Sequence, residues 1–293
     1  MKVLVTGAGG RTGQAIVPAL AGAGHAVRVF VRRPESGAEL TARGAAEVVV
    51  GDLNDDAAVE NALQGVQALF HIPPTMSSDE IPIGKRMVAA AKAVGLGHFV
   101  YYSVLHPQIQ GLPHHWNKLF VEEAVIESGL TYTILQPCSY MQNTMSDWAN
   151  ITGAGVHTMA FPVDIALSLI DLADVAAVAA KVTGNPAHYN ATYELAGPAL
   201  SVRDKARILS DVLGREVRPA QESVAQWKET VLAGGMPAHM VEGRAKMFAH
   251  YGETGLSANP GILEWLLGRP ATGFAQFVTR AVAERAAKAH EPA

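Results

Sequence analysis

Residues 3–13 read VLVTGAGGRTG, in which a short aliphatic run passes directly into a glycine-rich turn. The aliphatic run predicts a buried strand, and the helical spacing of apolar residues over 12–23 predicts that a helix follows the turn. In such a turn Gly7 permits the sharp bend, Gly10 lets the backbone approach a phosphate, and Gly13 allows close helix packing. Backbone N–H groups at a helix start bind phosphate, so the stretch predicts a dinucleotide site; the alternative is a connector that binds no ligand.

Strand and helix patterns alternate through the first half of the chain. The strand candidates are short, β-branched or aromatic, and nearly continuous in hydrophobicity, which is typical of strands buried on both faces. This alternation predicts an α/β protein with a Rossmann-type doubly wound parallel sheet. The strand candidates are 3–5, 27–31, 48–50, 68–72, 99–102 and 131–135, and the helix candidates are 12–23, 56–63, 83–94 and 116–126.

The pattern changes after Pro137, where helical spacing becomes dominant. We predict a Rossmann domain over residues 1–150, to which a segment of about 171–200 returns. Residues 151–293 are expected to form a smaller, mostly helical lobe, interleaved with the first domain, that binds a substrate or a partner. The later helix candidates are 174–182, 201–213, 227–232, 237–251, 262–267 and 274–288, with one strand candidate at 193–195.

Composition limits the classes of partner. The 293 residues carry a formal net charge of −4 and no stripe of Lys and Arg, so we expect no nucleic-acid partner. A single cysteine, Cys138, forms no intramolecular disulfide and gives no zinc ligand set, so we expect no metal. Three aspartates interrupt the apolar segment 163–180, and the first strand follows Met1-Lys2 at once. We therefore expect no membrane span and no signal peptide, and a cytoplasmic protein.

Two arginines follow the second strand candidate, where a site that prefers NAD usually carries a carboxylate. Arg32 and Arg33 would bind the 2′-phosphate that a carboxylate repels, which favours NADP(H) over NAD(H). The alternative is a pair of solvated surface arginines. At the end of the third strand candidate, Asp52 either accepts from the adenine amino group, with Leu53 packed on the ring, or caps the next helix.

Further polar residues follow the fourth and fifth strand candidates. His71-Ile72-Pro73 ends the fourth, and we expect it to lie over the cofactor, with His71 near the ribose. Ser103 closes the fifth and is predicted to bind substrate or cofactor, the alternative being a turn residue. His114 and Lys118 are four residues apart and so share one face of the helix that begins near them.

Together these residues resemble the NmrA-like family, an atypical branch of the short-chain dehydrogenase/reductase superfamily, over nearly the whole chain. Ordinary superfamily members carry Tyr-x-x-x-Lys, and His114 stands at the tyrosine position. The resemblance implies that Lys118 holds the nicotinamide ribose, that His114 donates a proton, and that Pro137, Ser139 and Tyr140 pass along the nicotinamide. The motifs are VTGAGGRTG at 5–13, Arg32-Arg33, GDL at 51–53, YSV at 102–104, His114-x-x-x-Lys118, LQPC at 135–138 and the tail between 251 and 270.

Alternatives remain for several of these residues. Lys118 could be a solvated helix lysine, His114 an exposed or capping residue, and Cys138 is expected to be a buried structural thiol. The predicted catalytic residues are Lys118, His114 and Ser103. The predicted cofactor-binding residues are Thr6, Gly7, Gly10, Arg11, Thr12, Gly13, Arg32, Arg33, Asp52, Leu53, His71, Ile72, Pro73, Ser103, Lys118, Pro137, Ser139 and Tyr140.

Two functions are compatible with these motifs. The first is an NADPH-dependent reductase of a quinone or of another small carbonyl or aromatic electrophile. The second is a non-catalytic sensor of the NADP(H) redox state, which the absence of the superfamily tyrosine favours and the presence of Lys118 and Ser103 disfavours. A small-molecule substrate is expected for the first and a regulatory protein partner for the second, and a homodimer is compatible with both.

Overall fold

The computed structural model describes residues 1–289 and divides into two compact units. The first unit comprises Met1–Pro137 and Leu172–Leu195, and the second comprises Cys138–Asp171 and Ala196–Ala293. The chain therefore leaves the first unit at Pro137, earlier than the predicted residue 150, and returns to it from Leu172 to Leu195. The assignment of substrate or partner binding to the second unit stays a prediction.

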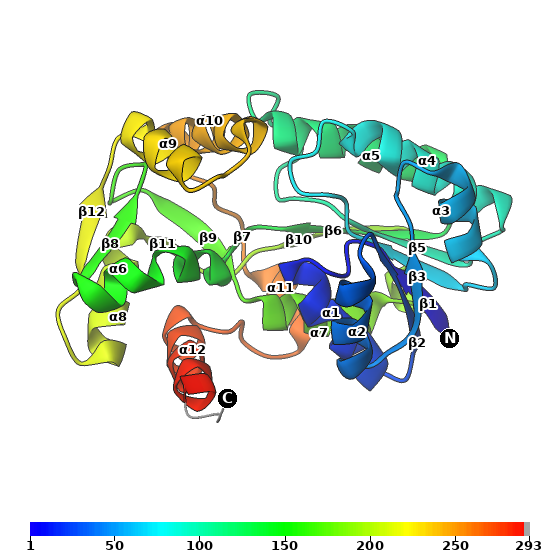
Figure 1. Ribbon diagram of the computed structural model, residues 1–293, viewed down its shortest axis with the longest axis horizontal. Coiled ribbons are helices and arrows are strands. Elements are labelled where there is room, and N and C mark those ends of the chain that lie inside the picture. Colours follow the sequence, from blue (N-terminus) through cyan, green and yellow to red (C-terminus); the bar gives the residue numbers. More distant parts are fainter. Residues whose placement is uncertain (290–293) are drawn as a thin grey trace. The chain divides into compact units, whose positions relative to one another are not determined.

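A seven-stranded sheet forms the centre of the first unit, with the strand order β10-β6-β5-β4-β1-β2-β3 (Figure 1). Every neighbouring pair in this sheet is parallel. This arrangement confirms the predicted Rossmann-type sheet. The strands are β1 (Lys2–Val5), β2 (Ala26–Val31), β3 (Ala45–Val50), β4 (Ala68–His71), β5 (His98–Tyr102), β6 (Tyr132–Pro137) and β10 (Ala191–Leu195).

Helices cover both faces of this sheet, as a doubly wound fold requires. Helices α3, α4 and α5 lie over one face, and α1, α2 and α7 over the other (Figure 1). The sequence did not predict α2, and α4 begins at Glu80 rather than Ile83. The helices are α1 (Arg11–Gly22), α2 (Pro34–Ala42), α3 (Asp56–Leu63), α4 (Glu80–Ala93), α5 (Pro113–Glu127), α7 (Leu172–Val182) and the short 3₁₀ turn η2 (Pro186–His188).

Burial differs between the central and edge strands. All residues of β4 and β5 are buried, which fits their continuous apolar sequences. The prediction that the strands are buried on both faces was wrong for β3, because this strand lies at the sheet edge and, after the buried Ala45, alternates between partly buried and exposed positions. Its residues Val48 and Val50 are 38% and 50% exposed.

The second unit is mainly helical and also contains two small sheets that the sequence did not predict. One sheet has the order β11-β9-β7 and the other pairs β12 with β8. Its core includes Trp148, Leu209 and Phe277. The elements are β7 (Ser139–Tyr140), η1 (Met141–Asp147), α6 (Trp148–Gly153), β8 (Val156–Met159), β9 (Ala166–Ile170), β11 (Ala199–Ser201), α8 (Val202–Leu213), β12 (Arg218–Gln221), α9 (Val224–Ala233), α10 (Ala238–Thr254), α11 (Gly261–Leu267) and α12 (Phe274–Ala289).

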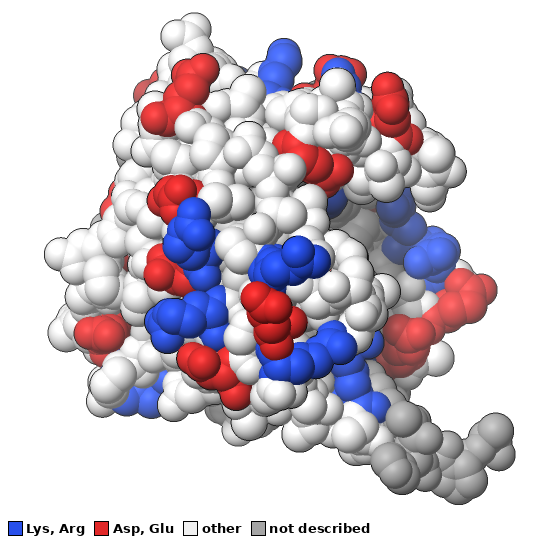
Figure 2. Space-filling model, turned by 90° about the vertical axis from the view of Figure 1, so that its left-hand side faces the viewer, with Lys and Arg blue, Asp and Glu red and all other residues white. Residues whose placement is uncertain are grey.

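Charges of both signs share the surface. On the face drawn in Figure 2, basic and acidic side chains are interspersed. Exposed ion pairs in the second unit include that of Arg203 with Asp164 at 2.7 Å. Between residues 1 and 289, no helix combines the length and the apolar character that crossing a bilayer requires.

Candidate functional site

The strand order reverses between β1 and β4, and in open α/β sheets ligands bind at the carboxyl ends of the strands at this point. Thr6 joins the two strand ends. Its N–H donates to the carbonyl of Phe70 at 3.1 Å, and its hydroxyl accepts from the N–H of Ile72 at 3.1 Å. The hydroxyl also lies 2.8 Å from Nδ1 of His71. Predicted residues from both strands are therefore held together at the switch point.

The glycine-rich turn leaves no room for side chains at two of its positions. Gly7 has φ +63°, and a Cβ there would lie 2.5 Å from the carbonyl oxygen of Ile72. A Cβ at Gly13 would lie 2.4 Å from Cα of Ala8, closer than real side chains come. Gly10 is different, because a Cβ there would meet only the Gly7 carbonyl oxygen, at 3.3 Å. Packing thus requires Gly7 and Gly13, whereas Gly10 keeps the outer face of the turn open.

The start of α1 is suited to an anionic ligand. Its N-cap is Gly10, which has no side chain to cap the helix. The first i→i−4 hydrogen bond runs from the N–H of Gln14 to the carbonyl of Gly10, so the N–H groups of Thr12 and Gly13 precede it. No acidic residue lies in this first turn. An open glycine cradle at the positive end of a helix dipole fits the pyrophosphate of a dinucleotide.

The ends of β2 and β3 carry the residues predicted for the adenosine side. The N–H of Gly51 donates to the carbonyl of Val31 at 3.0 Å, which ties these ends together. Arg32 and Arg33 are exposed, and within residues 1–289 their guanidinium groups have no ion pair. Asp52 is exposed as well.

The capping alternative for Asp52 was wrong, because Asp55 caps α3 with its own side chain. The carboxylate of Asp52 instead accepts from the N–H of Asn54 at 2.8 Å, in a local turn. Leu53 is half-buried and packs against the core between the sheet and α3. An adenine contact through Asp52 and Leu53 stays a prediction.

A buried ion pair lies beside the switch point. Nζ of Lys118, on α5, is 2.5 Å from Oε1 of Glu80, the first residue of α4. The side chains of Lys118 and Glu80 are 6% and 0% exposed. The alternative of a solvated lysine was therefore wrong. Sequence reasoning missed Glu80, because the helix was predicted to begin at Ile83 and no motif marks the residue.

The second oxygen of Glu80 faces His114. Nδ1 of His114 lies 3.7 Å from Oε2 of Glu80, and both atoms are buried without a hydrogen-bond partner. Tyr101 and His71, on β5 and β4, stack with their ring centroids 6.0 Å apart, and Lys118 Nζ lies 5.9 Å from the centre of the Tyr101 ring. The hydroxyl of Tyr101 and Nε2 of His71 are also buried without a partner. We call Glu80, Lys118, His114, Tyr101 and His71 the buried polar cluster.

Burial and charge set the protonation of this cluster. Burial alone would raise the pKa of Glu80, but the charge of Lys118 and the contact with His114 lower it below its usual value. Burial lowers the pKa of His71 to about 3, and the charge of Lys118 contributes to the shift. Burial also lowers the pKa of His114, although Glu80 opposes the shift. At neutral pH the cluster therefore holds one ion pair and two neutral imidazoles.

Ser103 belongs to a second buried group. Its hydroxyl donates to Oε1 of Glu122, and the side-chain amide of Gln136 lies 2.9 Å from both carboxylate oxygens. Ser103 and Glu122 are 3% and 5% exposed. Because the hydroxyl proton of Ser103 is donated to Glu122, Oγ can act toward a ligand only as a hydrogen-bond acceptor. A catalytic or cofactor-binding role of Ser103 stays a prediction.

Pro137, Ser139 and Tyr140 lie where the chain passes from the first unit into the second. Pro137 ends β6, and its carbonyl accepts from the N–H of Leu105 at 2.8 Å. Ser139 and Tyr140 form β7 of the second unit and pair with β9. Their contact with a nicotinamide stays a prediction. Cys138 is 5% exposed, which confirms the expected buried thiol, and burial raises its pKa to about 12.

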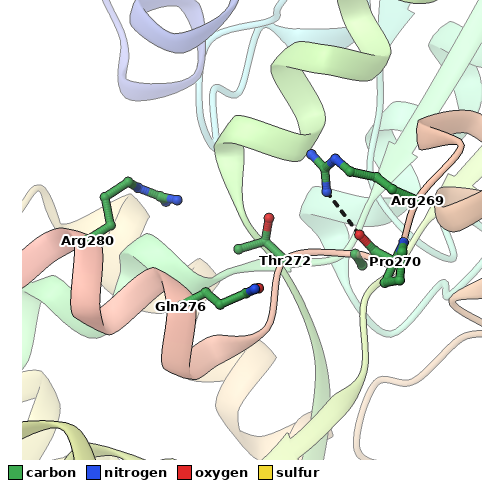
Figure 3. A pocket seen from close by; sticks show the side chains of 6 residues that line it. Arg269, Pro270, Thr272, Gln276 and Arg280 are labelled. Atoms are coloured by element: carbon green, nitrogen blue, oxygen red, sulfur yellow. Dashed lines mark hydrogen bonds between the residues drawn. The ribbon is translucent and has the colours of Figure 1, made fainter.

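A pocket of about 500 Å³ lies in the second unit, lined by Arg269, Thr272, Gln276 and Arg280 among others (Figure 3). Arg269 and Arg280 approach it from opposite sides. The guanidinium of Arg280 pairs with the buried carboxylate of Asp171, which fixes its position.

The fold and the glycine cradle define a Rossmann-type protein with a site for a dinucleotide. A family model, the NmrA-like family, matches residues 1–284. The chain belongs to the NmrA-like family, as the sequence predicted.

Known reductases resemble the chain over almost its whole length. It is 36% identical to the (4-alkanoyl-5-oxo-2,5-dihydrofuran-3-yl)methyl phosphate reductase of Streptomyces griseus, over 93% of this chain and 95% of the relative. It is 31% identical to the NAD(P)H azoreductase of Xenophilus azovorans, over 94% and 96% of the two chains. The crystal structure of the NADPH-dependent quinone oxidoreductase of Escherichia coli in complex with NADPH matches with a TM-score of 0.83 and 28% identity, over 96% and 99% of the two chains.

Proposed function

We propose that this protein is an NADPH-dependent reductase of a quinone or of another small carbonyl or aromatic electrophile. The observation that carries the proposal is the open glycine cradle at Gly10, beside a buried lysine at the switch point. Similarity to an azoreductase and to a quinone oxidoreductase over more than nine-tenths of the chain supports a reductase. The cofactor supplies the hydride, and the protein supplies binding, orientation and a shielded environment.

The glycine turn and the arginines would hold the two phosphate groups of the cofactor, which are the central pyrophosphate and the 2′-phosphate of the adenosine. The N–H groups at the start of α1, around Thr12 and Gly13, would bind the pyrophosphate. Arg32 and Arg33 would bind the 2′-phosphate, which is the basis for a preference for NADP(H) over NAD(H). Their exposure and their lack of ion pairs within residues 1–289 support this role, because no internal carboxylate competes with the phosphate.

Lys118 and His114 would act at the nicotinamide end. The lysine has three donors, of which one goes to Glu80 and two remain for ribose hydroxyls, and its burial keeps water away from them. The side chain of His114 is 16% exposed, so part of its ring can meet a ligand. The acceptor would be a planar molecule whose reduction places charge on an oxygen or nitrogen atom.

NADPH oxidation with a panel of acceptors tests this function. The panel contains a benzoquinone, a naphthoquinone, an azo dye and an enone that carries a phosphate group. We expect turnover with at least one acceptor. In Lys118→Met we expect the turnover rate to fall by about 100-fold or more, which is the scale of a lost positioning group. The matched control is Lys92→Met on the neighbouring helix α4, which should keep full activity.

Absence of turnover with every acceptor, together with tight NADPH binding, would contradict the reductase and leave the redox sensor. A sensor would act through a regulatory protein partner, which the sequence also predicted. Sedimentation of the protein with NADPH and with NADP⁺ tests the predicted homodimer in both redox states.

A further inference from the structure

We propose that Glu80 is the positioning residue of this site: one carboxylate oxygen holds Lys118, and the other fixes His114 as the tautomer that carries its proton on Nδ1. The proposal rests on the proposed function for its catalytic meaning. The arrangement itself is a property of the chain without any ligand.

The two oxygens of Glu80 have different partners. Oε1 pairs with Nζ of Lys118 at 2.5 Å. Oε2 is buried without a hydrogen bond and faces Nδ1 of His114 at 3.7 Å, an atom that is itself buried without a partner. An approach to the ordinary N–H···O distance of about 2.9 Å would satisfy both orphaned atoms at once. A single carboxylate therefore serves the two residues that the His-x-x-x-Lys spacing places on one face of α5.

This carboxylate decides which imidazole nitrogen carries the proton. An ionised carboxylate accepts hydrogen bonds and donates none, so Glu80 favours the His114 tautomer with an N–H on Nδ1, and the hydroxyl of Tyr101 is the other donor that faces this carboxylate. The neutral ring then carries its lone pair on Nε2. Carboxylates hold histidine tautomers in this way in catalytic triads. The lone pair on Nε2 makes His114 a hydrogen-bond acceptor toward a ligand hydroxyl at neutral pH.

The groups around His114 reinforce the neutral form. Lys118 and His115 lie on its own helix, and the His115 ring centre is 5.9 Å from that of His114. Glu80 faces it from α4, while Tyr101 on β5 and His71 on β4 complete the cluster. Burial first, and then the charge of Lys118, lower the pKa of His114, while Glu80 opposes them.

This tautomer changes the role expected for His114 as a proton donor. His114 was expected to donate a proton near neutral pH. With Nδ1 committed to Glu80, it can donate from Nε2 only after taking up a second proton, as an imidazolium. Because burial lowers the pKa of His114 below the usual histidine value, proton donation by His114 should increase only in more acidic solution than for an ordinary histidine.

Nitrogen-15 NMR of the histidine side chains tests the proposal on the free protein. In wild type at about pH 7.5, we expect His114 to show a protonated Nδ1 and a bare Nε2; the signal is assigned by its loss in His114→Gln. In Glu80→Gln, we expect this pattern to be lost or mixed with the other tautomer and the pKa of His114 to fall further. The control Glu47→Gln removes the carboxylate that pairs with Lys2 and Arg28, and should leave the signal unchanged.

A bare Nδ1 in wild type would overturn the proposal, and so would an unchanged signal in Glu80→Gln. If Glu80→Gln does not fold, Glu80→Gln combined with Lys118→Met removes both charges, and the wild-type signal still decides. A second readout is the pH profile of turnover in Glu80→Gln compared with wild type. If Glu80 were merely structural, the two profiles would have the same shape. The NMR result needs neither cofactor nor acceptor, so failure of the proposed reductase appears separately, as NADPH oxidation that does not occur.

Discussion

Lys118 and Glu80 lie on different helices, α5 and α4, and join in an ion pair of 2.5 Å that solvent hardly reaches. Two charges removed from water are costly unless each has its partner. The pair therefore makes each residue dependent on the other, and it places the predicted ribose-binding lysine beside a carboxylate that no sequence motif marks.

Replacement of this lysine should destabilise the fold. Lys118→Met leaves the carboxylate of Glu80 buried and unpaired, and we expect a loss of about 3–5 kcal/mol in the free energy of unfolding at pH 7. Without the lysine, burial raises the folded-state pKa of Glu80 above its unfolded-state pKa. The variant should therefore recover stability as the pH falls from the folded-state pKa toward the unfolded-state pKa. Urea unfolding at pH 7 and pH 5 measures both effects.

The double variant is the control for this prediction. Glu80→Gln combined with Lys118→Met removes both charges and should be more stable at pH 7 than Lys118→Met alone. A single variant that unfolds like wild type at both pH values would contradict the buried pair.

Substitutions in the glycine turn should separate packing from ligand binding. Gly13→Ala places a Cβ 2.4 Å from the backbone of Ala8 and should reduce stability. Gly10→Ala meets only one carbonyl, at 3.3 Å, so we expect a folded protein with NADPH affinity lowered about tenfold or more. Thermal unfolding and fluorescence titration with NADPH measure the two effects.

Gly22→Ala is the matched control in the same helix, since a Cβ there meets nothing within 4 Å. It should retain NADPH affinity and gain about 0.5–1 kcal/mol of stability from helix propensity. Equal NADPH affinities in Gly10→Ala and Gly22→Ala would show that Gly10 does not approach a phosphate.

Much of the first unit was predictable because its signals are local. Aliphatic runs such as Val3–Val5 form strands that are buried on both faces, and the helix 56–63 has the predicted bounds. The exposed edge strand β3 was misjudged, since its valines are apolar while its place at the edge follows from topology. The short strands of the second unit, such as β7, have too few residues for a periodic signal.

The site was less predictable, because it depends on contacts between distant residues. The glycine turn has a motif, and the structure places Thr6 and His71 together as the strand order implies. Glu80 lies before the predicted helix and pairs across 38 positions, so no spacing reveals it. Tyr101 looks like any core residue of a buried strand, although its hydroxyl has no partner.

Acid should destabilise the first unit through buried histidines. Nδ1 of His98 accepts from the N–H of Gly184 at 3.0 Å, and Nε2 lies 2.9 Å from the hydroxyl of Thr133. Burial, and then the charge of His188, lower the pKa of His98 to about 4. Because the unfolded chain takes up this proton first, stability should fall between pH 6.5 and 4 by about 1.4 kcal/mol per pH unit for this residue.

In His98→Gln, the free energy of unfolding should fall less steeply between pH 6.5 and 4, by the contribution given for His98. The control His239→Gln, at an exposed position, should have the same slope as wild type. Urea unfolding at half-unit pH steps gives the slopes. A slope in His98→Gln as steep as that of wild type would contradict a neutral, buried His98.

The thiol of Cys138 should resist alkylation in the folded protein. Burial raises its pKa to about 12, so the reactive thiolate is scarce at pH 8. We expect iodoacetamide to modify Cys138 at least about 100-fold more slowly in the native protein than in guanidinium chloride, as followed by mass spectrometry. Equal rates in the two conditions would place the thiol in contact with solvent.

The two arginines at the end of β2 should set the choice of cofactor. Arg32→Gln combined with Arg33→Gln should weaken NADPH binding about 10- to 100-fold, the scale of a lost hydrogen bond to a charged group, and leave NADH binding nearly unchanged. Arg43→Gln, an exposed arginine at the far end of α2, is the control and should change neither affinity. A parallel loss for both cofactors would mean that the arginines contact something other than the 2′-phosphate.

Calorimetric titration of the wild-type chain with NADPH and with NADH, in the same buffer, tests the dinucleotide site most directly. The glycine cradle and the arginines together predict saturable one-to-one binding of both, with NADPH at least about tenfold tighter. A folded sample that releases no binding heat with either, or that prefers NADH, would contradict the assignment.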